Sequence, residues 1–490
     1  VEAGNTIQLQ NPGDLLNKPR RLRLSVSAHP QIHLLPALRK LLRYPYGCAE
    51  QTTSKLQALL HAPRLLSRAG DTAGGQQASQ KIDAGILRLR SMQTRSGGLA
   101  YWPGNLQAQP WVTAYAAAFL ARAESAGHEV DPLFKKELLN YLQKELDRSD
   151  QSIHTQAAIV YVLAAFGQPD RGWMTRLSEQ RKLLDIGSRA HLAAAHLAGG
   201  RRDLALEILG DRVPDLAVKA THAGRITNGP RQWALLMHTL MDLDENHPWL
   251  PGLANRLIQA GRRGVWSNTL ADSSAISALS RYQTLQDKPA KFRGWIQSGP
   301  NTLGAFTHQK PWHRVLADPS GSIRIHSEGS GRLFIAATTE GLLPREKIVM
   351  QDRNLQVRRS WSDAEGKPID PANIYVGDLI HVSIRLKSLA NGSVANVAVV
   401  DALPAGFEAD NPALAGSAGS ASGGSRPDRV EFLDDRVLLF STAGKTVRTF
   451  RYKLRAVQAG HFALPPVEAS SMYDASFASR HGMGRVEVRP

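Results

Sequence analysis

The sequence contains a single cysteine among its 490 residues, so no disulfide can form within the chain. It also lacks any run of about 18 consecutive apolar residues, the length that a helix needs to cross a bilayer. The first residues, Val1-Glu2-Ala3-Gly4, are not typical of a signal peptide. These features predict a soluble chain that fits a piece of a longer protein, and they neither support nor contradict export.

Acidic residues are in deficit, with 43 Asp and Glu against 60 Lys and Arg and a formal net charge of +17. Such a balance favours anionic neighbours, such as nucleic acid, anionic lipid or acidic wall polymers. The basic residues nevertheless occur singly or in pairs, as at Lys135-Lys136 and Arg262-Arg263, without the long basic tract of a nucleic-acid surface. We therefore expect no nucleic-acid partner.

The central part of the chain has the pattern of packed helices. From Gln31 to about Thr284, apolar residues recur at helical spacing between Gly, Pro and Asp signals. The blocks Ala114–Ala123 and Ala157–Ala165 are apolar nearly all round, which predicts a double-layered ring of helices, an alpha/alpha toroid. The expected helices are Thr52–Ala69, Gln77–Met92, Trp111–Ala126, Pro132–Leu146, Ser152–Phe166, Arg189–Ala198, Arg231–Leu243 and Leu270–Tyr282.

Strand patterns flank this block. Residues Arg21–Ser27 alternate polar and apolar side chains, and after Pro300 short strand-like runs return at close intervals. Asn391-Gly392 is typical of a hairpin turn, and the Ala-, Gly- and Ser-rich segment Asn411–Asp428 is predicted to be a mobile loop. The expected strands are 21–27, 322–326, 332–338, 378–386, 394–400, 430–433, 437–440, 447–454 and 485–488. The pattern predicts a multidomain α plus all-β protein: the toroid inserted in a small β domain, followed by a β-sandwich.

The cysteine lies in the most informative segment, Tyr44-Pro45-Tyr46-Gly47-Cys48-Ala49-Glu50-Gln51. Pro45 and Gly47 favour a turn, and the following residues read as the start of a helix. Cys48 and Gln51 would then share one face of the first helical turn. The positive end of the helix dipole favours a thiolate there, which can attack the Gln51 carboxamide, expel ammonia and leave an internal thioester. The alternative is that Cys48 is a buried small apolar residue, as most free cysteines are.

The string from Tyr44 to Thr52 resembles the thioester motif, Cys-x-Glu-Gln, of the alpha-2-macroglobulin and complement family in its bacterial form. The resemblance continues through Met92-Gln93, Gly97-Gly98, Tyr101–Gly104 and Trp111–Tyr115, and the string Asp401–Glu408 resembles the C-terminal macroglobulin-type domain of bacterial members. It covers nearly the whole chain. The N-terminal macroglobulin domains and the bait region that proteases cut are missing.

The resemblance implies a C-terminal fragment with a CUB-like β domain at residues 1–30 and 301–345, a toroid thioester domain at 31–300 and a receptor-binding-type sandwich at 346–490. It implies a single-turnover, broad-spectrum protease trap used in bacterial defence or colonisation, with no enzyme turnover, cofactor or metal. Expected partners are target proteases, the N-terminal macroglobulin domains and, in bacterial relatives, a peptidoglycan synthase. The implied location is the periplasm, with an inner-membrane anchor on the full-length protein.

Further site residues are expected around Cys48. Water must be kept from a thioester, and we expect Tyr44, Tyr46 and Trp102 to help to shield it. The resemblance implies the same role for Met472 and Tyr473, and the alternative is that this pair belongs to a turn that anchors the sandwich's own core. Complement-type members place a catalytic histidine about one hundred residues after the thioester, and His154 resembles it in context. Near a helix start His154 would tend to stay neutral and able to act as nucleophile or base. A structural histidine that caps or packs at the helix start is the alternative.

Two other functions remain open. A carbohydrate-active toroid enzyme could stack sugars on Trp102, Trp111 and Trp266, although the sequence shows no acid–base pair for it. An interaction module with an inactive thioester is the other. The histidines do not form a metal-ligand pattern: His191 and His196 are five residues apart and lie on different faces of a helix.

Overall fold

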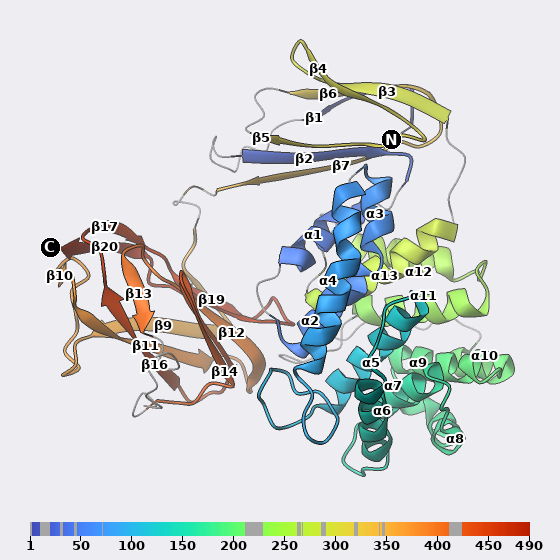
Figure 1. Ribbon diagram of the computed structural model, residues 1–490, viewed down its shortest axis with the longest axis horizontal. Helices are drawn as coiled ribbons and strands as arrows, with labels where there is room; N and C mark the ends of the chain where they lie inside the picture. The colour runs from blue at the N-terminus through green and yellow to red at the C-terminus, as the bar shows by residue number, and fades with distance from the viewer. Residues whose placement is uncertain are drawn as a thin grey trace. The chain divides into compact units, whose positions relative to one another are not determined.

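The computed structural model describes residues 2–9, 20–29, 33–43, 47–70, 72–210, 229–261, 266, 268–285, 291–317, 322–342, 344, 348–410 and 424–490. Two compact units are present, one built on residues 1–219 and 227–344 and the other on residues 345–490. The first contains a small β domain and a helical domain, and the second consists of strands (Figure 1). Within the described ranges, no helix is both long enough and apolar enough to span a membrane.

The helical domain runs from α1 to α13. Its helices are α1 (Leu35–Arg43), α2 (Ala49–Leu59), α3 (Ala62–Arg68), α4 (Thr72–Arg90), α5 (Pro110–Ser125), α6 (Pro132–Leu146), α7 (Ile153–Ala165), α8 (Arg171–Glu179), α9 (Ile186–Ala198), α10 (Arg202–Leu209), α11 (Gly229–Leu243), α12 (Leu250–Ala260) and α13 (Thr269–Leu285). A short 3₁₀ turn, Arg181–Leu183, joins α8 to α9.

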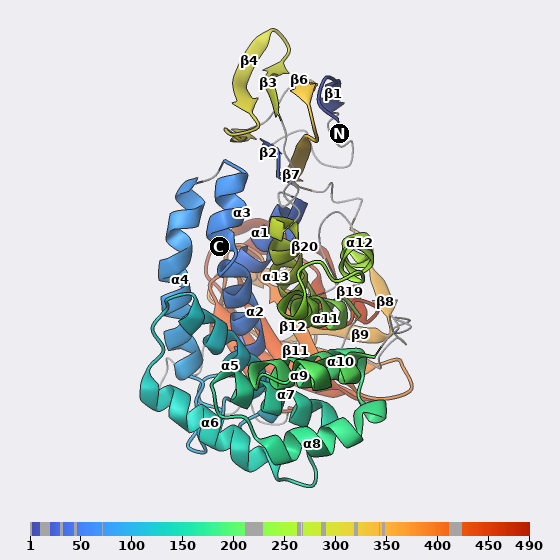
Figure 2. The same ribbon diagram turned by 90° about the vertical axis from the view of Figure 1, so that its right-hand side faces the viewer.

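The described helices form a closed double ring. The inner helices α2, α5, α7, α9, α11 and α13 each contact the next, and α13 contacts α2 again. The intervening helices α4, α6, α8, α10 and α12 pack outside them, and α1 packs against α13 and α2. Figure 2 shows α4, α6 and α8 along the edge of the domain, with α5, α7 and α9 nearer its centre. The predicted alpha/alpha toroid is confirmed.

One predicted helix is wrong. The expected helix Thr52–Ala69 is two helices, because α2 ends at Leu59 and α3 begins at Ala62. Pro63 occupies the first turn of α3. Proline has no N–H for the carbonyl of Leu59, so the helix breaks there.

The small β domain is discontinuous in sequence. Its strands are β1 (Thr6–Leu9), β2 (Arg20–Ser27), β3 (Lys291–Ser298), β4 (Asn301–Thr307), β5 (Trp312–Ala317), β6 (Ile323–Ser330) and β7 (Phe334–Gly341). They form two antiparallel sheets, β1-β6-β3-β4 and β5-β2-β7. Each sheet joins a strand that precedes the helices to strands that follow them, so the helical domain is an insertion, as predicted.

The second β segment begins earlier than the expected residue 301. Residues 291–298 form β3, which pairs with β4 and β6. Alternate β3 residues Phe292 and Ile296 are buried in the core of this domain. Residues 291–300 therefore belong to the β domain and not to the toroid.

The second unit is a β-sandwich. Its strands are β8 (Gln351–Arg353), β9 (Leu355–Ser362), β10 (Ile374–Tyr375), β11 (Leu379–Ser388), β12 (Val394–Ala402), β13 (Phe407–Asp410), β14 (Arg429–Leu433), β15 (Arg436–Ala443), β16 (Arg448–Ala456), β17 (Gly460–Leu464), β18 (Val467–Ser471), β19 (Ala478–His481) and β20 (Gly484–Arg489). The main sheets are β13-β16-β11-β9 and β14-β15-β12-β18-β19-β8, with a smaller sheet, β10-β20-β17. Alternate side chains of both main sheets form one apolar core.

The predicted hairpin at Asn391-Gly392 is wrong. Strand β11 pairs with β9 and β16, whereas β12 pairs with β15 and β18, so this connection crosses from one sheet to the other. A buried ion pair also joins the sheets, between Arg359 of β9 and Asp401 of β12. Of the segment 411–428 predicted to be a mobile loop, residues 411–423 lie outside the described part of the chain.

Candidate functional site

The first turn of α2 holds the predicted reactive pair. Cys48 is the N-cap residue of α2, and Gln51 is the third residue of the helix. The Cys48 backbone N–H donates to Oε1 of Gln51 at 3.3 Å, within a capping box in which the Cys48 side chain faces the Gln51 backbone N–H. Cys48 and Gln51 are each only 1% exposed. The expected juxtaposition of thiol and carboxamide on one helical turn is present.

A loop from the helix α4–α5 connection covers this turn. The carbonyl of Tyr101 accepts from the Ala49 backbone N–H at 2.8 Å, which fixes the loop against the start of α2. Trp102 follows and is 4% exposed. Burial raises the pKa of the Tyr101 hydroxyl, and negative charge on Cys48 and Glu50 raises it further. The surroundings of Cys48 are therefore dry and close to an aromatic ring system.

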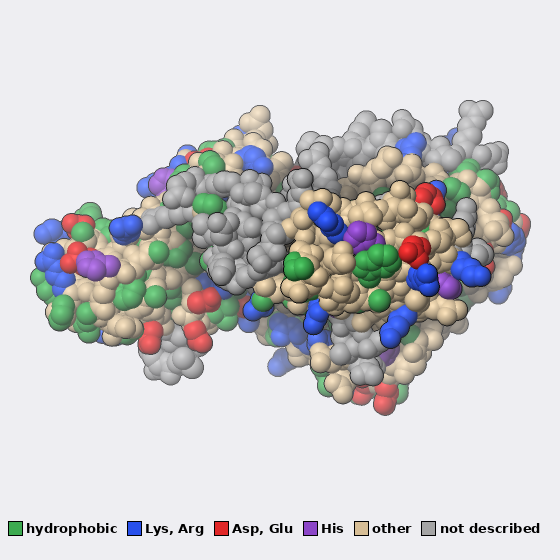
Figure 3. All heavy atoms as spheres, turned by 90° about the horizontal axis from the view of Figure 1, so that it is seen from above, with side chains coloured by type: hydrophobic (Ala, Val, Ile, Leu, Met, Phe, Trp, Pro, Cys, Tyr) green, Lys and Arg blue, Asp and Glu red, His purple; other side chains and the backbone are tan. Residues whose placement is uncertain are grey.

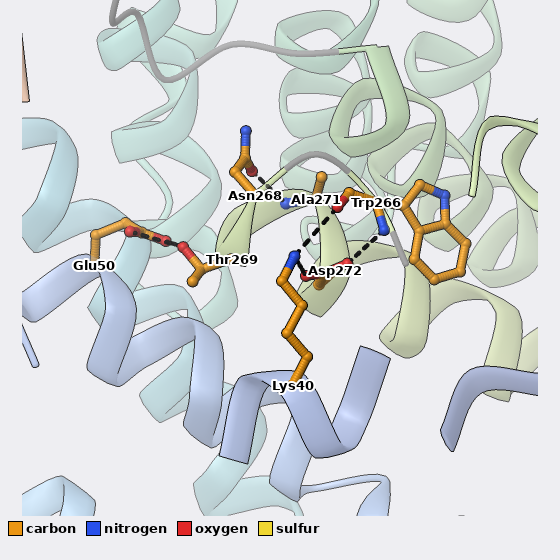
Figure 4. Close-up of polar contacts among 7 residues, drawn as sticks. All are labelled: Lys40, Glu50, Trp266, Asn268, Thr269, Ala271 and Asp272. Carbon is orange, nitrogen blue, oxygen red and sulfur yellow. Dashed lines mark hydrogen bonds and ion pairs between the residues drawn. The ribbon is translucent and has the colours of Figure 1, made fainter. Parts of the chain in front are cut away.

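The carboxylate of Glu50 accepts several buried hydrogen bonds, and Figure 4 shows the contact with Thr269. Thr269, the first residue of α13, donates to Oε1 and Oε2 of Glu50 at 3.2 and 3.3 Å. Ser54 donates to Oε1 at 2.6 Å and also lies 3.0 Å from the hydroxyl of Tyr115. Burial and the Glu50 carboxylate raise the pKa of Tyr115 to about 12. The network ties α2 to α13 and α5 directly behind the Cys48–Gln51 turn.

A second buried group holds the start of α13. Asp272 accepts from the Trp266 backbone N–H at 2.6 Å and from Lys40 Nζ at 2.9 Å, and Asn268 caps the helix through the Ala271 N–H (Figure 4). Asp272 is fully buried. Burial raises its pKa to about 6, against the opposing effect of Lys40. Thr269 is thus presented to Glu50 by a rigid helix start.

The first turns of the inner helices meet at one mouth of the toroid. The Glu50–Thr269 contact joins the starts of α2 and α13. His154 near the start of α7 lies against the start of α9, and Gln232 in the first turn of α11 donates to Asp185, the N-cap of α9. Such contacts require inner helices that run in the same direction. Arg231 in the first turn of α11 also lies over Trp111 in the first turn of α5. Cys48, which is buried, and His154 therefore lie at the same end of the ring.

His154 is held by α9. Its Nδ1 lies 3.0 Å from Oγ of Ser188 and 3.8 Å from Oδ2 of Asp185. The side chain is 43% exposed. Ser152, and not His154, caps α7 by accepting from the Thr155 N–H. The Nδ1 of His154 is thus occupied by α9, which leaves Nε2 as the nitrogen for chemistry.

The remaining predicted residues are placed as follows. Tyr44 and Tyr46 lie outside the described residues. Met472 and Tyr473 follow β18 in the second unit, where the backbone N–H of Met472 donates to the Asn396 carbonyl at 2.9 Å. Tyr473 is 5% exposed, yet it is not among the described residues that form the apolar core of the sandwich. Their shielding role stays a prediction.

The tryptophans assigned to sugar stacking do not form an open platform. Trp102 and Trp266 are each 4% exposed, and Trp111 stacks on Tyr115 with ring centroids 5.4 Å apart. On the face in Figure 3, Lys and Arg stand singly or in small groups among Asp and Glu.

Sequence reasoning missed the roles of Ser54, Thr269 and Asp272. The signal was present in α13, where Thr269, Asp272, Ser273 and Ser277 recur on a helix otherwise rich in alanine. These polar residues are all buried. A buried polar stripe requires hydrogen-bond partners from neighbouring helices, and Glu50 is one of them.

Comparisons with known proteins agree with this architecture. Residues 30–145 match the A-macroglobulin TED domain, and residues 355–475 match the bacterial alpha-2-macroglobulin MG10 domain. The fold and these domains define a macroglobulin-type protein with a TED-type helical domain.

Curated relatives narrow the class. The chain is 29% identical to alpha-2-macroglobulin of Escherichia coli K12 over 92% of its own length, and 28% identical to that of Xylella fastidiosa Temecula1 over 95%. The chain is thus similar to bacterial alpha-2-macroglobulins over more than nine tenths of its length. It spans 29% and 30% of the length of these two relatives.

Solved structures show the same fold. Native E. coli alpha-2-macroglobulin, from domain MG7 to the C-terminus, matches with a TM-score of 0.81 at 24% identity, over 100% of this chain and 81% of that one. Salmonella alpha-2-macroglobulin reacted with methylamine matches with a TM-score of 0.80 at 23% identity, over 100% and 33%. The chain thus corresponds to the C-terminal region of bacterial alpha-2-macroglobulins.

Proposed function

We propose that this chain is the covalent trapping part of a bacterial protease inhibitor and that it acts through a thioester between Cys48 and Gln51. The observation that carries the proposal is the buried capping box of these two residues at the start of α2. The capping box holds the thiol and the carboxamide on one buried turn, as acyl transfer between them requires. The alpha-2-macroglobulin relatives support an inhibitor and not an enzyme with turnover.

The thioester forms by acyl transfer within the turn. The Cys48 thiolate attacks the side-chain carbonyl carbon of Gln51, the carbon–nitrogen bond breaks, and the nitrogen leaves as ammonia with the proton of the thiol. The helix dipole stabilises the thiolate. The Cys48 N–H already points at Oε1 of Gln51, where negative charge develops in the tetrahedral intermediate.

In the trapping step, the acyl group of residue 51 is transferred from the sulfur of Cys48 to the attacking protein. An amine or hydroxyl of the attacking protein adds to the thioester carbonyl, the carbon–sulfur bond breaks, and the Cys48 thiol is released. An amide or ester to residue 51 remains. Each molecule reacts once, so the process is inhibition without turnover.

His154 supports reaction with hydroxyl groups. Its position on the Cys48 mouth, with Nδ1 engaged by α9, leaves Nε2 free to accept the acyl group from Cys48 and pass it to a weak nucleophile. Asp185 and Ser188 act as positioning residues because they orient the ring.

Burial supports a thioester that waits for its target. Trp102 and the Tyr101 loop exclude water on one side, and we propose Tyr44, Tyr46, Met472 and Tyr473 for the remaining cover. For the full-length protein we propose attacking proteases as targets, the N-terminal macroglobulin domains as partners, a role in bacterial defence, and a periplasmic location. A peptidoglycan synthase partner and an inner-membrane anchor stay predictions.

Labelling with a fluorescent primary amine tests this function. The folded chain should incorporate about one label per molecule, and peptide mass mapping should place it on residue 51. Cys48→Ala should incorporate none, because no thioester can form. Gln57→Asn is a matched control that changes another amide of α2 and should label normally. Equal labelling of Cys48→Ala and the wild type would contradict the proposal.

Trapping itself is tested on the full-length protein. Incubation with a serine protease should give a conjugate that survives denaturing electrophoresis, and Cys48→Ala should lose it. If the wild type inhibits the protease but forms no conjugate, an interaction module with an inactive thioester would be favoured.

A further inference from the structure

One face of the β1-β6-β3-β4 sheet carries an aromatic platform. Alternate residues of these strands, such as Phe292 and Ile325, point inward and belong to the apolar core of the small β domain. The intervening residues form the outer face, where one row crosses all four strands: Thr6, His326, Trp295 and Ala305. Figure 3 looks down on the strands at the top of Figure 1, and over them it shows a histidine beside hydrophobic side chains, with charged side chains around them.

The ring of Trp295 is held against His326. The two rings are stacked, with centroids 5.2 Å apart and an interplanar angle of 19°. Nδ1 of His326 lies 2.9 Å from Oγ1 of Thr6, and Nε2 lies 3.1 Å from Oε1 of Gln297. Both ring nitrogens are thus engaged, which fixes the imidazole and, through it, the orientation of the indole.

The other face of Trp295 is turned toward β4. Its cross-strand partner there is Ala305, an exposed residue. Because a methyl group is too small to cover an indole ring, this half-buried tryptophan leaves one flat apolar surface for a partner from outside. The C–H face of a sugar ring is a surface of matching shape.

Polar side chains border the platform on both sides along the strands. The row on one side consists of Gln8, Arg324, Gln297 and Thr302. The row on the other side consists of Glu328, Arg293 and Thr307. Amide, hydroxyl and guanidinium groups around one apolar ring suit a sugar, because its hydroxyl groups lie at the edge of its apolar face.

A hollow of about 480 Å³ adjoins the second of these rows. Arg293, Thr307 and Glu328 line it, together with Lys291 and Gln309. Its volume is in the range of small-molecule sites, which is roughly 300–1,000 Å³. Trp295 and Arg293 are two residues apart on β3, or about 7 Å along the strand, so a ligand on the indole reaches the hollow with its next sugar unit.

The charge of this face is positive. Among the described strand residues that point outward here, Lys291, Arg293 and Arg324 are basic and Glu328 is acidic. Arg293 pairs with Glu328 at 3.0 Å, but the two side chains are 78% and 51% exposed. An ion pair so open to solvent is weak, so the guanidinium can also bind a carboxylate from outside.

We propose that the outer face of the β1-β6-β3-β4 sheet binds an acidic polysaccharide, with one sugar ring on Trp295 and a neighbouring carboxylate in the hollow beside Lys291 and Arg293. A polyanion held by charge alone would need no aromatic platform. A single-stranded nucleic acid stacks on successive aromatic side chains, whereas this face offers one open indole. Such binding would hold the protein on an acidic polymer, and it is independent of the thioester.

Calorimetric titration of the 490-residue chain with defined oligosaccharides tests the proposal. Hexagalacturonate or hexamannuronate should bind at about 0.15 M salt with a Kd below about 1 mM. Cellohexaose, a neutral chain of the same length, should bind at least about tenfold more weakly. Failure of both acidic oligosaccharides to bind, or equal binding of cellohexaose, would overturn the proposal.

Substitutions separate the platform from the overall charge. Trp295→Ala should lower the affinity for the acidic probe at least about tenfold, whereas Trp173→Ala, which removes a half-buried tryptophan of α8, should not. Arg293→Gln should lower it several-fold, and Arg171→Gln, which removes an exposed cation of α8, should leave it unchanged. Wild-type affinity in Trp295→Ala would mean that net charge alone attracts the probe, and it would overturn the proposal.

Hydroxyl-radical footprinting of the wild type decides the matter even if Trp295→Ala fails to fold. The acidic oligosaccharide that binds should protect Trp295 from oxidation and leave Trp173 unprotected, as measured by peptide mass mapping. Absence of protection at Trp295 would overturn the proposal. So would tighter binding of a single-stranded oligonucleotide at Trp295, or a ligand-free dimer that Trp295→Ala abolishes, because these results assign the face to nucleic acid or to a second copy of the chain.

Discussion

The hydroxyl of Thr269 donates to both carboxylate oxygens of Glu50, at 3.2 and 3.3 Å. Glu50 lies between Cys48 and Gln51 in sequence, while Thr269 starts the last inner helix of the ring. A contact between residues 219 positions apart thus closes the toroid next to the reactive pair. The closure of the helical ring is therefore linked directly to the turn that holds Cys48 and Gln51.

Removal of the hydrogen bond between Thr269 and Glu50 should lower the free energy of unfolding. Thr269→Val keeps the shape of the side chain but leaves a buried carboxylate with fewer donors, which costs about 1–3 kcal/mol of unfolding free energy. Urea unfolding measures the loss. Thr269→Ser retains the hydroxyl and should stay close to the wild type. Equal destabilisation by both variants would show that packing of the methyl group, and not the hydrogen bond, matters here.

Asp272 should make stability depend on pH. Its folded pKa of about 6 lies above the ordinary value of 3.8, so the folded state holds its proton more tightly. The contribution of Asp272 therefore falls as pH rises from about 4 to about 6, by about 3 kcal/mol in all, and is level above that range. Urea unfolding of the wild type and Asp272→Asn across this window isolates the effect, because the other groups titrate alike in both. A difference between the two proteins that stays constant with pH would rule it out.

His154 should matter mainly for hydroxyl acceptors. His154→Ala should slow transfer to glycerol at least about tenfold, with little change in the rate with methylamine, because acyl transfer through imidazole assists weak nucleophiles. The rates follow from release of the Cys48 thiol. Normal amine reactivity in this variant would also show that the thioester itself is intact.

The positioning role of Asp185 is tested in the same assay. Asp185→Asn retains a cap for α9 but removes the charge beside Nδ1 of His154, and it should slow glycerol transfer less than His154→Ala does. Equal slowing for glycerol and methylamine in either variant would indicate a structural effect on the mouth.

Met472 and Tyr473 should protect the thioester. Replacing both by alanine should speed hydrolysis and the methylamine reaction several-fold while the melting temperature changes little, because Tyr473 lies outside the described sandwich core. Val467→Ala, a substitution within that core, is the control that should lower the melting temperature. If the double variant instead loses much stability at unchanged amine reactivity, the pair belongs to the sandwich.

Most of the large-scale architecture could be predicted from the sequence, because long helices with regular apolar spacing are recognised reliably. The helix Pro132–Leu146 was predicted at its observed bounds, and α5, α7 and α13 within a few residues. The outer helices α8, α10 and α12 were missed, since each is short and buries a single face. Many strands were missed as well. In β3 and β4, polar side chains and an internal glycine interrupt the apolar pattern. The other missed strands are β1, β5, β8, β9, β10, β13, β17, β18 and β19.

The reactive pair was predictable because its spacing is local. Cys48 and Gln51 meet within one helical turn, so only three peptide linkages of chain determine their geometry. The partners of Glu50 were not, because Thr269 and Tyr115 approach only when the ring closes. The crossing from β11 to β12 was misread for a related reason: Asn391-Gly392 permits a tight turn, but the choice of sheet depends on packing across the sandwich.

The intact mass of the freshly purified, folded chain tests the central claim most directly. Thioester formation should leave the wild type one ammonia lighter than its sequence, with Cys48 unreactive toward thiol reagents. Methylamine should then add one amine and release one reactive thiol, and Gln51→Ala should show neither change. A wild-type mass equal to that of the sequence, with one thiol that reacts at once and no gain from methylamine, would contradict a thioester between Cys48 and Gln51.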